Sequence, residues 1–184
     1  MRKRTIAALV IVAIPAAVAA FAATKPDTFR VERSTTIQAS PEAIAAHITD
    51  FHRWESWSPY EKLDPGMKKS YSGAEQGPGA IYAWEGSKAG TGRMEIRDAS
   101  SGLVRIQLDF SKPFEAHNTA EFTLQPEGDG TRVTWAMHGP NPFMSKVIGV
   151  FMDMDELLGK DFASGLANLK AVAEAPPAAP AATS

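Results

Sequence analysis

The chain has 184 residues, a formal net charge of -2 and no cysteine. Acidic and basic residues are mixed along the sequence without a basic stripe, which argues against a nucleic-acid partner. The absence of cysteine excludes disulfides and thiol chemistry. The part of the chain between its two atypical ends suffices for one domain.

Residues 1–23 predict a targeting or anchoring segment. Basic residues 2–4 precede an uninterrupted apolar run, residues 6–23, and the positive-inside rule keeps the basic end in the cytoplasm. The small residues Ala20 and Ala22 favour a cleaved signal peptide, whereas the length of the run favours an uncleaved membrane anchor. Both interpretations predict an exported protein, periplasmic or extracytoplasmic, that is either secreted after cleavage or anchored in the cytoplasmic membrane by its N-terminus.

A folded domain is expected over residues 29–174, after a short linker at 24–28. Residues 29–37 have the alternation and β-branching of a strand. Ser40 and Pro41 then provide an N-cap and a first helical residue, which predicts a helix to about position 51. A loop rich in aromatic residues follows.

Strand-like runs separated by turn signals occupy the middle of the domain. The expected strands are residues 67–71, 79–85, 92–97, 103–110, 115–124 and 131–138. Short connections between consecutive strands predict an antiparallel meander.

Residues 141–174 predict one long C-terminal helix. Asn141 and Pro142 are typical of a helix start, and apolar residues then recur with a period near 3.6. The apolar stripe needs a partner surface, which a sheet curled around the helix would supply. Residues 175–184 are rich in alanine and proline, and they predict a disordered tail.

Several motifs accompany this order of elements. They are the strand-to-helix segment 31–42, the W-x-x-W-x-P loop at 51–59, and the glycine-led runs 77–84, 90–92 and 130–135. Over about residues 28–174 the chain resembles the START-like helix-grip superfamily, also called SRPBCC, and within it the polyketide cyclase/dehydrase-like group. The resemblance implies an α+β helix-grip fold, in which a curved antiparallel sheet of about six or seven strands wraps around the C-terminal helix. It also implies a cavity between sheet and helix that holds an apolar small molecule.

The strand at 115–124 is the most informative about such a cavity. Its expected inward side chains are Ala116, Asn118, Ala120, Phe122 and Leu124. Small side chains leave volume for a ligand, and Asn118 would orient it, because pockets combine apolar walls with few polar groups. Alternatively, the alanines simply let the long helix approach.

Aromatic residues on two other strands have the spacing of inward side chains. Tyr82, Trp84 and Trp135 would line a pocket, or they belong to an ordinary core. The opposite phase of the strand at 79–85 would instead turn Glu85 inward.

Trp54 and Trp57 lie in the aromatic loop. They would gate a pocket mouth or touch membrane lipid, because tryptophan favours such interfaces. The alternative is that the loop packs against the first strand.

The long helix supplies Phe151 on its apolar stripe and Asp155 beside it. A buried carboxylate at Asp155 would have a raised pKa suited to acid–base chemistry, whereas a residue at the solvated edge of the stripe would not. The candidate ligand-binding residues are therefore Tyr82, Trp84, Asn118, Ala120, Phe122, Trp135, Phe151 and Asp155.

The four histidines lack the spacing of a metal site, and the sequence has neither a phosphate-binding glycine loop nor a nucleophile motif. We therefore expect no metal, no cofactor and no catalytic residue. The first functional hypothesis is a protein that binds or carries a hydrophobic small molecule or lipid outside the cytoplasmic membrane. The alternatives are a polyketide cyclase or dehydratase-like enzyme, and a structural or envelope-stress protein without a ligand.

Overall fold

The computed structural model describes residues 2–100 and 102–176, with side chains from residue 13 onward. Across these residues seven strands form one antiparallel sheet in the order β1-β7-β6-β5-β4-β3-β2. The strands are β1 (Thr28–Ile37), β2 (Lys68–Gly73), β3 (Ala80–Glu85), β4 (Thr91–Ser100), β5 (Leu103–Lys112), β6 (Ala116–Glu127) and β7 (Gly130–Pro140). Strands β2 to β7 follow one another as hairpins, and β1 pairs with β7 at one edge. The expected meander is confirmed.

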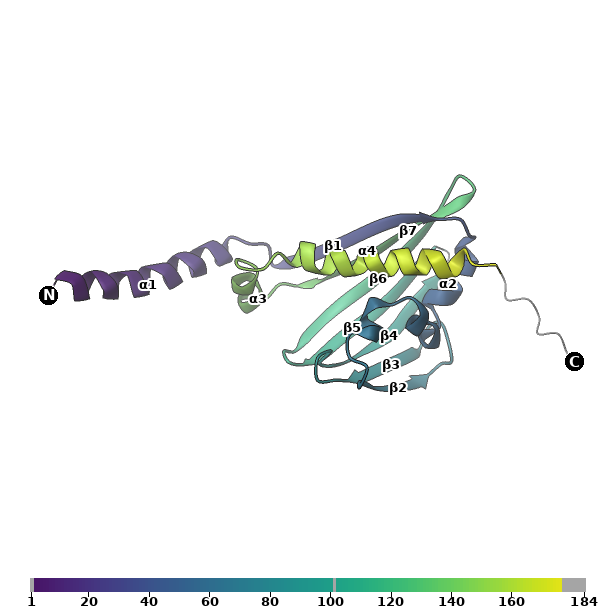
Figure 1. Ribbon diagram of the computed structural model, residues 1–184, viewed down its shortest axis with the longest axis horizontal. Coiled ribbons are helices and arrows are strands. Elements are labelled where there is room, and N and C mark those ends of the chain that lie inside the picture. Colours follow the sequence, from purple (N-terminus) through teal and green to yellow (C-terminus); the bar gives the residue numbers. More distant parts are fainter. Residues whose placement is uncertain (1, 101, 177–184) are drawn as a thin grey trace, which may run out of the picture.

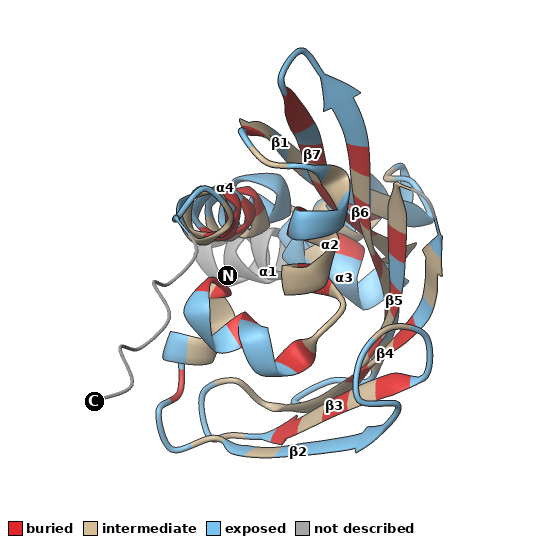
Figure 2. Cartoon of the chain, turned by 90° about the vertical axis from the view of Figure 1, so that its right-hand side faces the viewer, coloured by how far each residue is buried: buried red, intermediate tan, exposed pale blue. Residues whose placement is uncertain are grey.

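The sheet curves around a long helix, α4 (Met154–Ala173), which lies on the concave side next to β1 and β7 (Figure 1; Figure 2). Three short helices follow β1, namely α2 (Pro41–Ile48), η1 (Phe51–Ser56) and η2 (Pro59–Lys62). They occupy the space between α4 and the strands on the far side of the curve. The helix-grip fold that the sequence predicts is therefore the observed one.

Local sequence accounts for the start of α2. The Ser40 hydroxyl accepts a hydrogen bond from the Ala43 N–H at 3.3 Å, and Pro41 occupies the first turn. The helix ends at Ile48, earlier than expected, because the Asp50 carboxylate caps η1 by accepting from the His52 N–H. The chain thereby changes direction before the tryptophans.

The expected single helix over residues 141–174 is wrong, since two helices, α3 (Phe143–Ile148) and α4, share this segment. Gly149 ends α3, and the Asp153 carboxylate starts α4 by accepting from the Glu156 N–H at 3.1 Å. Asn141 does not cap a helix. Its backbone N–H and side-chain amide instead donate to the carbonyl groups just before β1.

Two glycines let α4 approach the sheet closely. A Cβ at Gly159 would overlap the guanidinium of Arg33 on β1, and a Cβ at Gly165 would overlap the ring of Trp135 on β7. Both glycines are buried. Each glycine lowers helix stability by roughly 1 kcal/mol relative to alanine. A larger side chain at either position would prevent the close packing of α4 on the sheet.

The helix α1 (Arg2–Ala23) precedes β1 and leaves the domain at the end where β7 stops and α3 begins (Figure 1). Its last turn packs against α3, and Ala22 is buried there. Among the described residues, no helix combines the length and the mean hydropathy that crossing a bilayer would require. The predicted tail at 175–184 falls, from residue 177 onward, outside the described residues.

An open apolar groove beside a packed aromatic core

The strand register turns the same rows of side chains toward α4. Tyr82 pairs with Met94, Met94 with Leu108, and Leu108 with Asn118 across four neighbouring strands. These residues are all buried, whereas Glu85 is exposed. Tyr82 and Trp84 thus have the inward phase, and the opposite phase, with Glu85 inward, is wrong.

One end of the space between sheet and helix is filled by aromatic rings. Phe122 and Trp135 stack at 5.0 Å between ring centroids, and Trp135 stacks on Phe162 of α4 at 4.5 Å. Trp54 and Trp57 add their edges to the same cluster. We call this the aromatic core. It places Phe122 and Trp135 in contact with protein rings on several sides.

The two loop tryptophans are structural. The Trp54 indole N–H donates to the carbonyl of Ile48 at 2.9 Å, and that of Trp57 donates to the carbonyl of His47 at 3.2 Å. Both rings are at most 3% exposed. The idea that they gate a pocket or touch lipid is wrong, and they pack against β6 and β7 rather than against β1.

The C-terminal half of α4 is held on both of its sides. Toward η1, the Asn168 amide donates to the carbonyl of Trp57 at 3.1 Å, and toward β1 the Lys170 ammonium donates to the carbonyl of Thr36 at 2.6 Å. Burial raises the pKa of Tyr60 of η2, and the nearby Asp161 carboxylate of α4 raises it further. This end of the space is closed.

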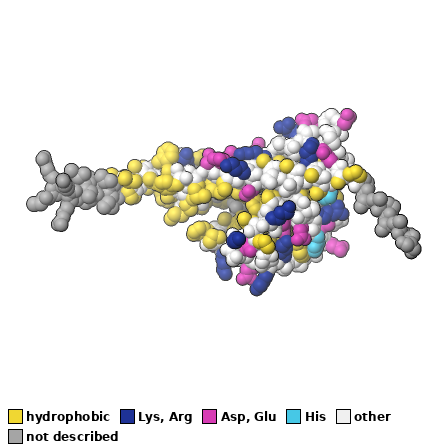
Figure 3. Space-filling model, viewed as in Figure 1, with side chains coloured by type: hydrophobic (Ala, Val, Ile, Leu, Met, Phe, Trp, Pro, Cys, Tyr) yellow, Lys and Arg dark blue, Asp and Glu magenta, His cyan; other side chains and the backbone are white. Residues whose placement is uncertain are grey.

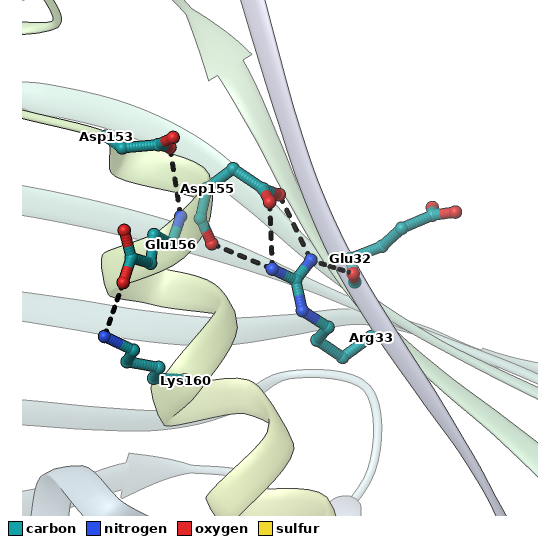
Figure 4. A network of polar contacts seen from close by, with 6 residues as sticks. All are labelled: Glu32, Arg33, Asp153, Asp155, Glu156 and Lys160. Atoms are coloured by element: carbon teal, nitrogen blue, oxygen red, sulfur yellow. Dashed lines mark hydrogen bonds and ion pairs between the residues drawn. The ribbon is translucent and has the colours of Figure 1, made fainter.

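Among the described residues, the side-chain hydrogen bonds between the N-terminal half of α4 and the rest of the domain lie on the β1 side. The Arg33 guanidinium donates to both carboxylate oxygens of Asp155, at 2.9 and 3.1 Å, and to its carbonyl at 3.0 Å (Figure 4). The hydrogen bond from Arg33 lowers the pKa of the exposed Asp155 carboxyl. The hypothesis of a buried acid with a raised pKa is therefore wrong, and Asp155 positions the helix.

On its other side, the first half of α4 exposes large apolar side chains in the part of the chain that the structure describes. Leu157 lies one helical turn before Asp161 and shares its side of the helix, yet Leu157 is 48% exposed because η2 does not extend that far. Met154 is 40% exposed. Figure 3 shows a hollow here, with hydrophobic side chains along both of its borders.

The sheet wall facing this hollow differs from the wall at the closed end. Its inward side chains keep 8–9% of their surface exposed, whereas Ile96, Ile106 and Phe122 are fully buried. We define the open groove by these wall residues together with the uncovered side of α4. Its members are Trp84, Met94, Leu108, Asn118, Met137, Met154 and Leu157.

Asn118 is the polar member of this wall. Its amide lies over Gly139 of β7, where a Cβ would overlap the amide oxygen. No protein group of the described residues hydrogen-bonds the Asn118 amide, so it remains available to a molecule in the groove. Gly139 lies just after the expected strand 131–138, and the alternation of that strand gave no indication that this glycine packs against Asn118.

The remaining candidates lie in different surroundings. Ala120 is buried beside Met137 at the base of the groove, while Phe151 is 73% exposed in the turn between α3 and α4. The Tyr82 hydroxyl donates a hydrogen bond to Glu61 at 2.9 Å. Burial raises the pKa of Tyr82 most, and the Glu61 carboxylate raises it further. The ring of Tyr82 faces the interior, but its hydroxyl is already bonded.

The described residues of the groove do not form a metal site, and the histidines on the neighbouring strands lie on the outer face of the sheet. Among the described residues, no group of three or more histidine, aspartate or glutamate side chains could hold a metal ion. His117 bonds Asp109 at 2.8 Å and His138 contacts Glu121 at 3.3 Å, so each of these two histidines has its own carboxylate on the outer face. Two shallow hollows beside η1 lie outside the space between sheet and helix.

Known proteins share this architecture. Protein CV1439 from Chromobacterium violaceum is 16% identical, with 82% of this chain and 100% of that chain covered and a TM-score of 0.56. The Aha1 dimer from Colwellia psychrerythraea is 16% identical, with 79% of this chain and 96% of that chain covered and a TM-score of 0.57. Major latex-like protein 151 from Panax ginseng is 12% identical, with 82% of this chain and 100% of that chain covered and a TM-score of 0.55. At such identities the likeness concerns the fold alone.

No curated protein matches the sequence significantly. The profile of a family described as polyketide cyclase/dehydrase and lipid transport matches residues 28–174, which is most of the chain and the same stretch as the resemblance in the sequence. The chain belongs to the polyketide cyclase/dehydrase and lipid transport family.

Proposed function

We propose that this protein binds or carries a hydrophobic small molecule or lipid in the open groove. The observation that carries the proposal is the unequal filling of the space between sheet and α4. One end is packed with aromatic rings, and the other has large apolar side chains exposed to solvent on the uncovered side of α4. Apolar walls with one oriented polar group, here the Asn118 amide, are typical of small-molecule sites.

A binder has more support than an enzyme. The family description includes cyclases and dehydrases, and such reactions require a group that moves a proton. Asp155, the acid considered for that role, is ionised and paired with Arg33. The Asn118 amide can orient a ligand but does not titrate.

We also propose that residues 1–23 direct the domain across the cytoplasmic membrane, as a cleaved signal or a retained anchor. The basic residues 2–4 and the apolar run that follows support this placement. Protease added to intact cells, after the outer barrier is permeabilised, should digest the domain. Full protection, with digestion only after cell lysis, would contradict export.

Ligand binding is tested by native mass spectrometry of the full chain, purified in a mild detergent whose own adducts are identified by mass. An organic extract of the same sample is profiled in parallel. We expect a reproducible apolar adduct on the natural protein. In the variant Ala120→Phe, the added ring lies next to Met137 at the base of the groove, and the adduct should be lost.

The matched control is Ala167→Phe, which adds the same ring on the exposed outer side of α4. It should keep the adduct. Because overpacking at Ala120 can destabilise the fold, Leu157→Asp provides a second test. It places a charge at the groove border without altering the core. Adduct levels that are equal in all four proteins would overturn the proposal.

A further inference from the structure

A second apolar feature lies outside the groove, on α3 and the turn that follows it. Five large side chains of residues 143–152 are between 39% and 73% exposed. They are Phe143, Met144, Ile148, Phe151 and Met152, and we call them the apolar tip. The one charged residue of this stretch, Lys146, is buried and pairs with Asp27. The five exposed side chains of the tip are thus all uncharged, and the carboxylate of Asp27, which pairs with Lys146, is exposed beside them.

The tip lies at the end of the folded domain from which α1 extends. It borders the open groove, because α4 begins two residues after Met152. It is also adjacent to the point where α1 leaves, since α1 packs against α3 (Figure 1). Phe21, on the last turn of α1, is 52% exposed and extends the apolar surface, which Figure 3 shows as a continuous band along this end.

We propose that the apolar tip inserts into the surface of a lipid bilayer, so that the open groove faces the membrane. Contiguous exposed apolar surface of this kind marks an interaction site. The tip lies at the end of the folded domain where α1 leaves it, and a bilayer can bury the exposed side chains of the tip together with the neighbouring α1. The tip is also adjacent to α1, whose residues 6–23 carry no charge, and phenylalanine suits the headgroup–acyl boundary.

The tip does not depend on the proposed ligand, because its test reports contact with lipid and not occupancy of the groove. The absence of cysteine makes site-specific labelling straightforward. Phe151→Cys places an environment-sensitive fluorophore on the tip. Asp129→Cys places the same fluorophore on the exposed β6–β7 turn at the opposite end of the sheet.

Each labelled full-length protein is mixed with vesicles of phosphatidylethanolamine and phosphatidylglycerol. At position 151 we expect a blue shift of the emission and a several-fold loss of quenching by aqueous iodide. At position 129 we expect neither. Adding Phe143→Ser and Met144→Ser, both at exposed positions, should restore quenching at position 151.

Two outcomes would overturn the proposal. If the label at 151 stays fully quenched by iodide with vesicles present, then the tip remains in water. If its emission shifts with protein concentration in the absence of lipid, then a second copy of the chain is the occupant. Native mass spectrometry of the groove ligand is independent of both results, so failure of the tip and failure of the ligand proposal are distinguishable.

Discussion

The two ends of the space between the sheet and α4 have the same strands as walls but differ in what fills them. At the closed end, Trp54 of η1 and its C-cap residue Trp57 meet Phe122 and Trp135, and α4 is hydrogen-bonded on both sides. At the open end, η2 does not extend along α4, and among the described residues Arg33 supplies the side-chain hydrogen bonds that hold the helix on the sheet. The difference shows that the inserted helices, rather than the sheet, decide how much of the concave face is available to a ligand.

The largest expected effect is at the closed end. Trp135→Ala should lower the free energy of unfolding by about 3–5 kcal/mol, because the ring is 3% exposed and stacks against both Phe122 and Phe162. Urea denaturation followed by circular dichroism measures the change. A loss below 1 kcal/mol would mean that the aromatic core is loosely packed, and the contrast between the two ends would fail.

A smaller effect is expected for ligand affinity at the open end. Asn118→Leu removes the polar group of the groove wall while keeping the side-chain volume. Affinity for a ligand with a polar head should fall roughly fivefold, the equivalent of about 1 kcal/mol for one hydrogen bond. Competition with a fluorescent fatty acid measures it, and a purely apolar competitor serves as the control that should bind unchanged. Equal losses for both competitors would contradict an orienting role.

The link between β1 and α4 should weaken with acid. The pKa of Asp155 is lowered in the folded protein, so the ionised carboxylate stabilises the fold above its ordinary pKa, near 3.9 in model peptides. That stabilisation is lost as the pH falls through the lowered folded pKa. Arg33→Met should therefore destabilise at neutral pH, and the difference from the natural protein should shrink in acid.

Amide hydrogen exchange locates this effect. In Arg33→Met, exchange should accelerate in the first turns of α4 and remain slow in its last turns, which Asn168 and Lys170 hold. The control Arg105→Met removes an ion pair with Glu121 on the outer face of the sheet, away from α4. Acceleration along the whole of α4 in Arg33→Met would mean that its two halves are not held independently.

The smallest expected effect is that of Leu157→Ala. Because this side chain is 48% exposed, the free energy of unfolding should change by no more than about 0.5 kcal/mol. The same urea titration as for Trp135→Ala measures it. A loss of 2 kcal/mol or more, of the order seen on truncating a buried leucine, would show that the groove is closed in solution.

Local signals predicted most of the fold, and they failed where two of them competed. Period-2 alternation identified the strands and the inward phase of Asn118 and Trp135, and it left two phases open for the strand that carries Tyr82. The apolar period of residues 143–173 suggested one helix, because a break of a few residues hardly disturbs a 3.6-residue repeat. The cap at Asp153 and the end at Gly149 instead divide it, and Phe151 consequently lies in a turn.

The candidate site was only partly predictable. The wall residues Trp84 and Asn118 follow from strand alternation, and Ala120 lies at the base of the groove. Leu157 and Met154 were not singled out, because their exposure depends on where η2 ends. Arg33 was also missed, since an arginine on the inner face of an edge strand has no local signal that links it to Asp155, 122 residues later.

By itself, the sequence determined the order of the elements, the faces of the strands, the start of α2 and the family motifs, because all of these depend on neighbouring residues. The tertiary structure alone decided that Trp54 and Trp57 fill one half of the space, and that glycines bring α4 onto Arg33 and Trp135. How fully the space between sheet and helix is filled depends on the combined volume of side chains from segments that are distant in sequence. The periodicity of apolar residues along one segment does not indicate that volume.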